Sequence, residues 1–156
     1  MHTKLLSIAA AVALAFAGVA QAQSTASTDR KARKAEEDKI NAEYKADKAK
    51  CKEMKGNEKD ACEADAKGKE NVAKAELKAK YDPTPANQRK VAEAKAEHQY
   101  KVAKEKCDAQ RGKEESACEK DAKAQFEKAK ADIKAKSASA SSERKAGTGS
   151  TSSTTK

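Results

Sequence analysis

The sequence predicts an all-α fold made of two tandem antiparallel helical hairpins, each closed by a disulfide, followed by a disordered C-terminal tail. Three observations support this class. Long segments of Ala, Lys and Glu, which all favour helices, contain few breakers. Four cysteines form two pairs, Cys51/Cys62 and Cys107/Cys118, and a glycine lies midway within each pair. The second pair and its surroundings repeat the first pair 56 residues later, so the hairpin is duplicated.

The first 22 residues have the pattern of a secretory signal peptide. Lys4 precedes an apolar run from Leu5 to Val19, and Ala20-Gln21-Ala22 is a small-x-small cleavage site. The apolar run is shorter than the roughly 20 residues that a membrane span needs. We expect cleavage near Ala22 and a periplasmic or secreted mature chain without a transmembrane span. The alternative is a signal peptide that is retained as an anchor.

The composition excludes a compact globular core. The formal net charge is +9, aromatic residues make up 3% of the chain, and there is no tryptophan. A compact domain of this length buries many more large apolar side chains. The composition suits long, thinly packed helices, and the alternative is a disordered basic chain. The cysteines and the repeat favour the helices.

The first hairpin is expected over residues 29–81, after a polar arm at residues 23–28. Its first helix begins after an N-cap at Ser27 or Thr28 and ends near Met54. Gly56 supplies the left-handed residue that ends this helix, and Asn57 caps a second helix that runs to Tyr81.

The second hairpin is expected over residues 86–136, after a proline linker at residues 82–85. In this linker Thr84 acts as an N-cap and Pro85 takes the first helical position. The two helices run to about Gln110 and Lys136, with Gly112 at the turn. Residues 137–156 are rich in Ser and Thr and lack large apolar side chains, so we expect a disordered tail.

Apolar residues at helical spacing predict the seam of each hairpin, that is, the line along which its two helices pack. The cysteines fall on the same stripes, as a bridge between the helices requires. The sequence leaves open whether the two hairpins form one four-helix bundle, splay apart about the linker or pair between molecules. The predicted seam residues are Ile40, Tyr44, Leu77, Tyr100, Phe126 and Ile133.

The cysteines are predicted to form structural disulfides, Cys51–Cys62 and Cys107–Cys118, because each hairpin then closes on itself in an oxidising compartment. A zinc site would need shorter Cys spacing and more histidines than His98, which we expect to be an exposed helix residue. A redox centre would need a C-x-x-C motif, which the sequence lacks. We therefore expect neither a metal nor a cofactor.

The motif Tyr-Lys-x2-Lys-x2-Cys-x4-Gly-x5-Cys-x3-Ala-Lys, starting at Tyr44, precedes the proline linker and is followed by a second Cys-Gly-Cys copy. This order resembles a group of small exported proteobacterial proteins rich in Lys and Ala, some of which are labelled cell-envelope-biogenesis TolA-like. The resemblance covers about residues 39–136 and implies an envelope location.

No pattern in the sequence indicates catalysis: there is no glycine-rich phosphate loop, no serine elbow and no paired carboxylates in a pocket-forming context. We expect a non-enzymatic periplasmic structural or interaction protein of the cell envelope. Its Lys-rich helices would face envelope proteins or an anionic envelope polymer. The alternative is a polyanion-binding protein that acts on nucleic acid or anionic lipid. The oligomeric state stays open.

Overall fold

The computed structural model describes the backbone of residues 17–147 and the side chains of residues 28–140 and 142. This part of the chain is all-α and contains no strand. The two disulfide-closed helical hairpins are confirmed. The helices are α1 (Ala17–Cys51), α2 (Gly56–Tyr81), α3 (Pro85–Cys107) and α4 (Lys113–Gly147).

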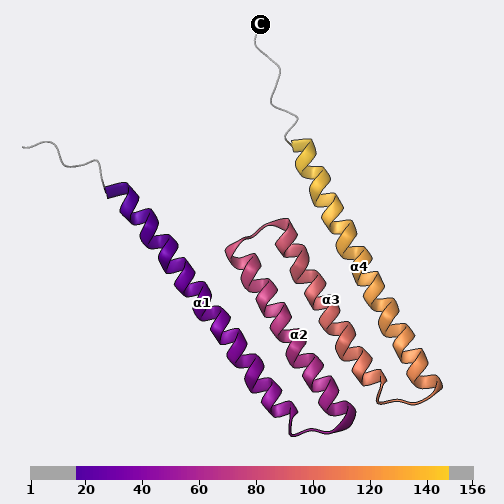
Figure 1. The fold of residues 1–156 in the computed structure, drawn as a ribbon. Helices are drawn as coiled ribbons and strands as arrows, with labels where there is room; N and C mark the ends of the chain where they lie inside the picture. Colours follow the sequence, from indigo (N-terminus) through magenta and orange to yellow (C-terminus); the bar gives the residue numbers. More distant parts are fainter. Residues whose placement is uncertain (1–16, 148–156) are drawn as a thin grey trace, which may run out of the picture.

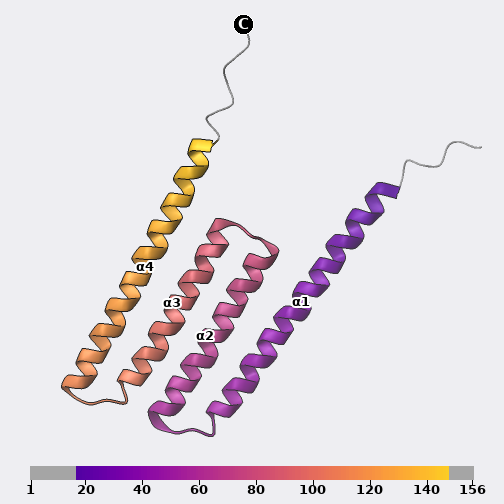
Figure 2. The ribbon, with the colours of Figure 1, turned by 180° about the vertical axis from the view of Figure 1, so that it is seen from behind.

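The four helices lie side by side in a single layer (Figure 1). Within residues 17–147, each helix packs only against its neighbours along the chain: α1 with α2, α2 with α3, and α3 with α4. The edge helices α1 and α4 do not meet, and the view from behind shows the same order (Figure 2). Of the three arrangements left open by the sequence, a closed four-helix bundle is therefore wrong for this chain, and the hairpins are joined along α2 and α3 rather than splayed.

The layer has two different ends. Both Cys-Gly-Cys turns lie at one end, and the proline linker between α2 and α3 lies at the other (Figure 1). The N-terminal part of α1 and the C-terminal part of α4 extend past the linker and diverge from each other. The edge helices are also the longest, with 35 residues each against 26 in α2 and 23 in α3.

The hairpin turns depend on two glycines in the left-handed region, Gly56 with φ 54° and Gly112 with φ 68°. Residues that carry a side chain rarely adopt this backbone conformation, so glycine is the favoured residue at both positions. Contrary to expectation, Gly56 opens α2 instead of ending α1, which stops at Cys51. The predicted N-cap Asn57 is also wrong: it lies inside the first turn, and Lys55 is the N-cap without a side-chain hydrogen bond.

Both outer helices differ from their expected bounds. Residues 23–28, expected as an arm, belong to α1, and α4 continues past Lys136 to Gly147. Alanines, which favour helices, recur through this continuation. Its serine hydroxyls donate to carbonyl oxygens three or four residues earlier, as in Ser137 to Lys134 at 2.8 Å and Ser139 to Ala135 at 3.1 Å. Residues 1–16 of the predicted signal peptide and residues 148–156 of the predicted tail lie outside the described residues.

The linker is held in place by hydrogen bonds. Thr84 caps α3 as predicted, because its hydroxyl accepts from the backbone N–H of Asn87 at 3.2 Å, and Pro85 occupies the first turn. The side-chain amide of Asn87 donates to the backbone carbonyl of Asp82 at 2.8 Å and to its carboxylate at 2.7 Å. Asn87 is only 5% exposed. These bonds fix the angle at which the second hairpin leaves the first.

Candidate interaction surface

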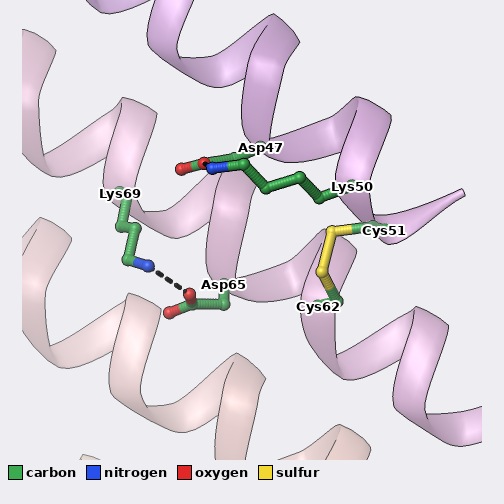
Figure 3. The surroundings of a disulfide bond; sticks show 6 residues. All are labelled: Asp47, Lys50, Cys51, Cys62, Asp65 and Lys69. Carbon is green, nitrogen blue, oxygen red and sulfur yellow. Dashed lines mark hydrogen bonds and ion pairs between the residues drawn. A yellow bond between two sulfur atoms is a disulfide. The ribbon is translucent and has the colours of Figure 1, made fainter. Parts of the chain in front are cut away.

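The disulfides lie where the sequence predicts them. In each bridge the two Cα atoms are 5.5 Å apart, and none of the four cysteines is free. Cys51 and Cys107 are almost completely buried, at 0% and 1% exposure. Figure 3 shows the first bridge beside the ionic side chains of α1 and α2. The cysteines are therefore structural cross-links at the hairpin tips.

The seam of the first hairpin is thin. Leu77 is 8% exposed, whereas Ile40 and Tyr44 are half-buried. Ile40 and Leu77 line a shallow groove between α1 and α2. The ring of Tyr44 receives Lys67 from α2, whose Nζ lies 5.1 Å from the ring centroid. The ammonium group of Lys67 makes a cation–π contact with the ring, and its aliphatic stem shields the ring from solvent as a larger apolar residue would.

The seam of the second hairpin contains the only ring stack among the described residues. Tyr100 of α3 and Phe126 of α4 stack with centroids 4.7 Å apart and planes 12° from parallel. Ala122, 8% exposed, is also buried on α4. Phe126 and the half-buried Ile133 line an open groove between α3 and α4. All six predicted seam residues are thus at least half-buried.

The two hairpins meet at a close contact between Gly68 of α2 and His98 of α3. A Cβ added to Gly68 would lie 2.0 Å from Cδ2 of His98, so the imidazole occupies the space that a side chain would need. His98 Nε2 lies 2.8 Å from Oδ1 of Asp65, and its side chain is 20% exposed. The expectation that His98 is an exposed helix residue is wrong, because α2 covers it.

Asp65 connects this contact to the rest of α2. Its second carboxylate oxygen pairs with Nζ of Lys69 at 2.6 Å, as drawn in Figure 3. Burial alone would raise the pKa of Asp65, but the hydrogen bonds from Lys69 and His98 outweigh burial and hold its pKa below the ordinary value. The carboxylate therefore stays ionised between the two hairpins.

Glu70 is the most buried charged residue in the described part of the chain, at 7% exposure. Its carboxylate accepts from Lys67 at 2.7 Å and from Lys74 at 2.5 Å. Burial favours the neutral acid, yet these two hydrogen bonds hold the pKa of Glu70 below its ordinary value of 4.5. One carboxylate thus orders two lysines on the same surface of α2.

The single layer presents two broad faces to solvent. One of them carries ion pairs between neighbouring helices, Lys80–Glu36 at 2.6 Å and Lys95–Glu76 at 2.7 Å. Lys80, Glu36 and Glu76 also line the groove between α1 and α2 on this side. We call it the paired face. Acids and bases alternate here, so its charges largely cancel.

The opposite face, which we call the basic face, has more lysines than acids. The helical repeat of 3.6 residues turns these lysines away from the paired face. The acids that lie among them are fewer than the lysines: Glu70, Glu93, Glu97, Asp108, Glu119 and Glu127. The basic face carries the exposed lysines Lys48, Lys67, Lys74, Lys78, Lys90, Lys101, Lys104, Lys123, Lys130 and Lys134.

Several lysines of the basic face have no carboxylate partner. Lys78, Lys90, Lys123 and Lys134 form no ion pair with any residue in the described part of the chain. Others are ion-paired, such as Lys101 with Glu97 of its own helix at 2.8 Å and Lys104 with Glu119 of α4 at 3.6 Å. The basic face therefore displays a surplus of lysines, where an anionic partner can reach it.

The described residues offer neither a metal cluster nor a membrane span. Residues 17–147 contain no group of three or more His, Cys, Asp and Glu side chains that could hold a metal ion. None of the helices α1–α4 is long and apolar enough to cross a membrane. The grooves between neighbouring helices are open along their length and have mixed apolar and charged linings.

The sequence did not predict the structural roles of three buried or half-buried side chains, those of His98, Asn87 and Glu70. Gly68 was the available signal for the contact with His98, because a lone glycine in a helix interior often marks a close approach. Asn87 follows a Thr-Pro cap at the spacing that permits a hydrogen bond back to the linker. Glu70 is flanked by lysines at i−3 and i+4, which is a common surface pattern and gives no sign of burial.

Comparison with known proteins found no matching protein family, no similar curated protein and no similar solved structure. The function is therefore inferred from the chemistry of the two faces and from the disulfides.

Proposed function

We propose that this chain is a non-enzymatic structural or interaction protein of an oxidising envelope compartment, the periplasm, and that its basic face binds an anionic component of the cell envelope. The observation that carries the proposal is the surplus of lysines over acids on the basic face of a single helical layer, where several of these lysines have no carboxylate partner. A flat array of charges suits an extended polymer or surface better than a small molecule.

The compartment is inferred from the covalent chemistry. Structural disulfides persist in oxidising compartments and are rare in the cytosol. All four cysteines are paired, which is compatible with an extracellular or periplasmic protein. The predicted signal peptide is consistent with this location, and its cleavage near Ala22 would leave most of α1 in the mature chain.

Nucleic acid is the alternative ligand, because lysine-rich surfaces attract any polyanion. The basic face offers little for bases to stack on: Tyr44 and Phe126 are half-buried in the seams, and their rings are covered by Lys67 and Lys130. Stacking contributes about 1–3 kcal/mol per base in proteins that bind single strands. We therefore favour an anionic component of the envelope over nucleic acid.

The test compares two variants of equal charge. Lys90→Glu/Lys123→Glu reverses two unpaired lysines of the basic face, whereas Lys106→Glu/Lys136→Glu reverses two unpaired lysines of the paired face. Binding of the oxidised mature protein to vesicles containing anionic lipid is measured by co-sedimentation. Each Lys near an anionic surface contributes about 1 kcal/mol, so the first variant is expected to bind at least about tenfold more weakly than the second.

Equal losses in the two variants would contradict a binding face and leave only a net-charge effect. Tighter binding of duplex or single-stranded DNA than of anionic vesicles at the same salt concentration would favour the nucleic-acid alternative. Crosslinking in the native envelope identifies the partner, and circular dichroism checks that both variants keep the helical fold.

A further inference from the structure

The interface between the two hairpins is built from surfaces that the repeat also places on the edges of the layer. Inside the chain, α2 is the second helix of the first hairpin and packs against α3, the first helix of the second hairpin. By the 56-residue repeat, α4 corresponds to α2 and α1 corresponds to α3. The outer side of α4 is therefore equivalent to the side of α2 that contacts α3, and the outer side of α1 to the side of α3 that contacts α2.

We propose that copies of this chain associate head to tail, with α4 of one copy packing against α1 of the next in the register of the α2–α3 interface. Such an interface joins two different surfaces and does not close on itself, so it extends the helical layer from copy to copy. Solenoid proteins grow in this way, with each unit contacting only its neighbours.

The Gly68–His98 contact of the internal interface has a compatible equivalent at the edges of the layer. Gly68 corresponds to Ala124 on α4, and His98 corresponds to Ala42 on α1. Inside the chain, the imidazole fills the space that a Cβ at Gly68 would need. At the edges, the methyl group of Ala124 would meet the methyl group of Ala42 instead. The larger residue on one side is offset by the smaller residue on the other, so the two helices can approach closely.

One ion pair of the internal interface also has an equivalent pair of opposite charges at the edges of the layer. Glu76 of α2 pairs with Lys95 of α3 at 2.7 Å. Their equivalents are Asp132 on α4 and Lys39 on α1, which again carry opposite charges. This charge complementarity would set the register between copies, because a shift along the helices would separate the two groups.

In a single copy, the outer sides of α1 and α4 are exposed to solvent and can therefore contact another copy. Ala35, Ala42 and Ala49 on α1 recur every seven residues and are exposed. On α4 the same spacing brings out Ala117, Ala124 and Ala131, all of them exposed. A seven-residue repeat keeps one side of a helix facing a partner helix along its length.

The association between copies should be weaker than the internal interface. Val72 and Val102 of the internal interface correspond to Lys128 and Ala46 at the edges, so less apolar surface would be buried. The His98–Asp65 contact at 2.8 Å has no equivalent, because Ala42 cannot form a hydrogen bond through its side chain. We therefore expect reversible, concentration-dependent assembly of the oxidised protein.

Cysteine pairs placed in this register test the geometry. A Cβ at Gly68 would lie 2.4 Å from Cγ of His98, so equivalent residues bring their Cβ atoms close enough for a disulfide, which spans roughly 3.5–4.5 Å between Cβ atoms. An equimolar mixture of Ala124→Cys and Ala42→Cys proteins, oxidised under native conditions, is expected to yield mainly the mixed dimer. The matched control mixes Ala124→Cys with Ala35→Cys, which lies about two turns away on α1.

Sedimentation of the unmodified oxidised protein over a range of concentrations measures the assembly itself. The average mass is expected to rise with concentration, and Ala124→Glu is expected to raise the dissociation constant at least tenfold. Ala86→Glu, on an exposed alanine that lies away from the outer edges, should leave it unchanged. A monomer at every concentration, or equal crosslinking in the control mixture, would overturn the proposal, and so would crosslinking of Ala42→Cys mainly with itself.

Discussion

Gly68 and His98 show how one pair of residues sets the distance between two hairpins. Glycine in the middle of a helix is unfavourable by roughly 0.5–1 kcal/mol relative to alanine. Here its missing side chain gives room to the imidazole of His98, which also bonds to Asp65. The contact replaces the large apolar residues that this interface lacks.

The Gly68/His98 pair predicts a change of sign in a double-mutant cycle. Gly68→Ala alone should destabilise the protein by about 1–3 kcal/mol, because the new methyl group overpacks the contact. In a His98→Ala background the same substitution should stabilise by about 0.5–1 kcal/mol, since only the helix preference of alanine remains. Urea unfolding of the four oxidised proteins measures both values. Additive effects would contradict the contact.

Glu70 predicts the response of the fold to acid. Its folded-state pKa lies below the ordinary 4.5, so its ion pairs contribute stability above that pH and lose it as the pH falls through the lower folded-state value. Unfolding measured from about pH 6 down to about pH 3 should show a steep acid limb in the native sequence. Glu70→Gln should flatten that limb by removing the titrating group.

Glu37→Gln is the control for the acid limb, because Glu37 is exposed and has no ion-pair partner among the described residues. If both substitutions change the acid limb equally, the buried position of Glu70 has no special effect on acid stability.

Among the elements, the linker between α2 and α3 decides whether the layer is one body. Two prolines in four residues suggest only a break between helices, and the sequence leaves the angle between the hairpins undetermined. The hydrogen bonds of Asn87 to Asp82 and the cap from Thr84 supply that angle. A hinge would need these groups to be solvated, whereas Asn87 is buried.

Asn87→Ala is expected to destabilise the oxidised protein by about 1–3 kcal/mol, because it removes two hydrogen bonds from a buried amide. Thr84→Ala should cost about 1 kcal/mol, the usual effect of losing an N-cap side chain. Thermal melts followed by circular dichroism give both values. Small-angle scattering of Asn87→Ala should also show a broader distribution of shapes, and an unchanged scattering curve would argue against an orienting role for Asn87.

At the scale of the whole molecule, the seams between the helices contain no tryptophan and few large apolar side chains, so they bury little apolar surface. Each disulfide closes a loop with a sequence separation of 11, and a loop of this size contributes about 3 kcal/mol. Surface ion pairs such as Lys101–Glu97 contribute roughly 0.2–0.5 kcal/mol each. The two bridges therefore make up a large share of the net stability.

Reduction is expected to lower the melting temperature sharply, because the unfolded chain gains conformational entropy once the two bridges are opened. Cys51→Ser/Cys62→Ser and Cys107→Ser/Cys118→Ser should each remove about 3 kcal/mol. Calorimetry with and without reductant checks the first statement, and the two variants separate the hairpins. Melting curves that coincide with and without reductant would show that the helices do not need the bridges.

The repeat and the cysteine spacing were enough to predict the helical class, the pairing of the cysteines and the residues of the two seams. Those features depend on short-range periodicity, which a sequence displays directly. The packing of the two hairpins in one layer depends on Gly68 fitting His98, a contact between residues far apart in the chain. It also depends on the buried amide of Asn87, whose bonds to Asp82 are local but leave no periodic pattern in the sequence. The ends of α1 and α4 also differed, because helix-favouring alanines continue both helices without any apolar partner.

Each bridge closes only its own hairpin, and this has a consequence for a protein that is pulled from its two ends. A force applied to α1 and α4 would pass through the sulfur atoms, so the turns between the cysteines would carry no load. With a separation of 11 residues, each bridge withholds roughly 30 Å of extension. The non-covalent contacts between neighbouring helices would part, while both tips stayed intact. An oxidised chain of this kind is a tether with a fixed limit to its stretch, and a reductant would lengthen it.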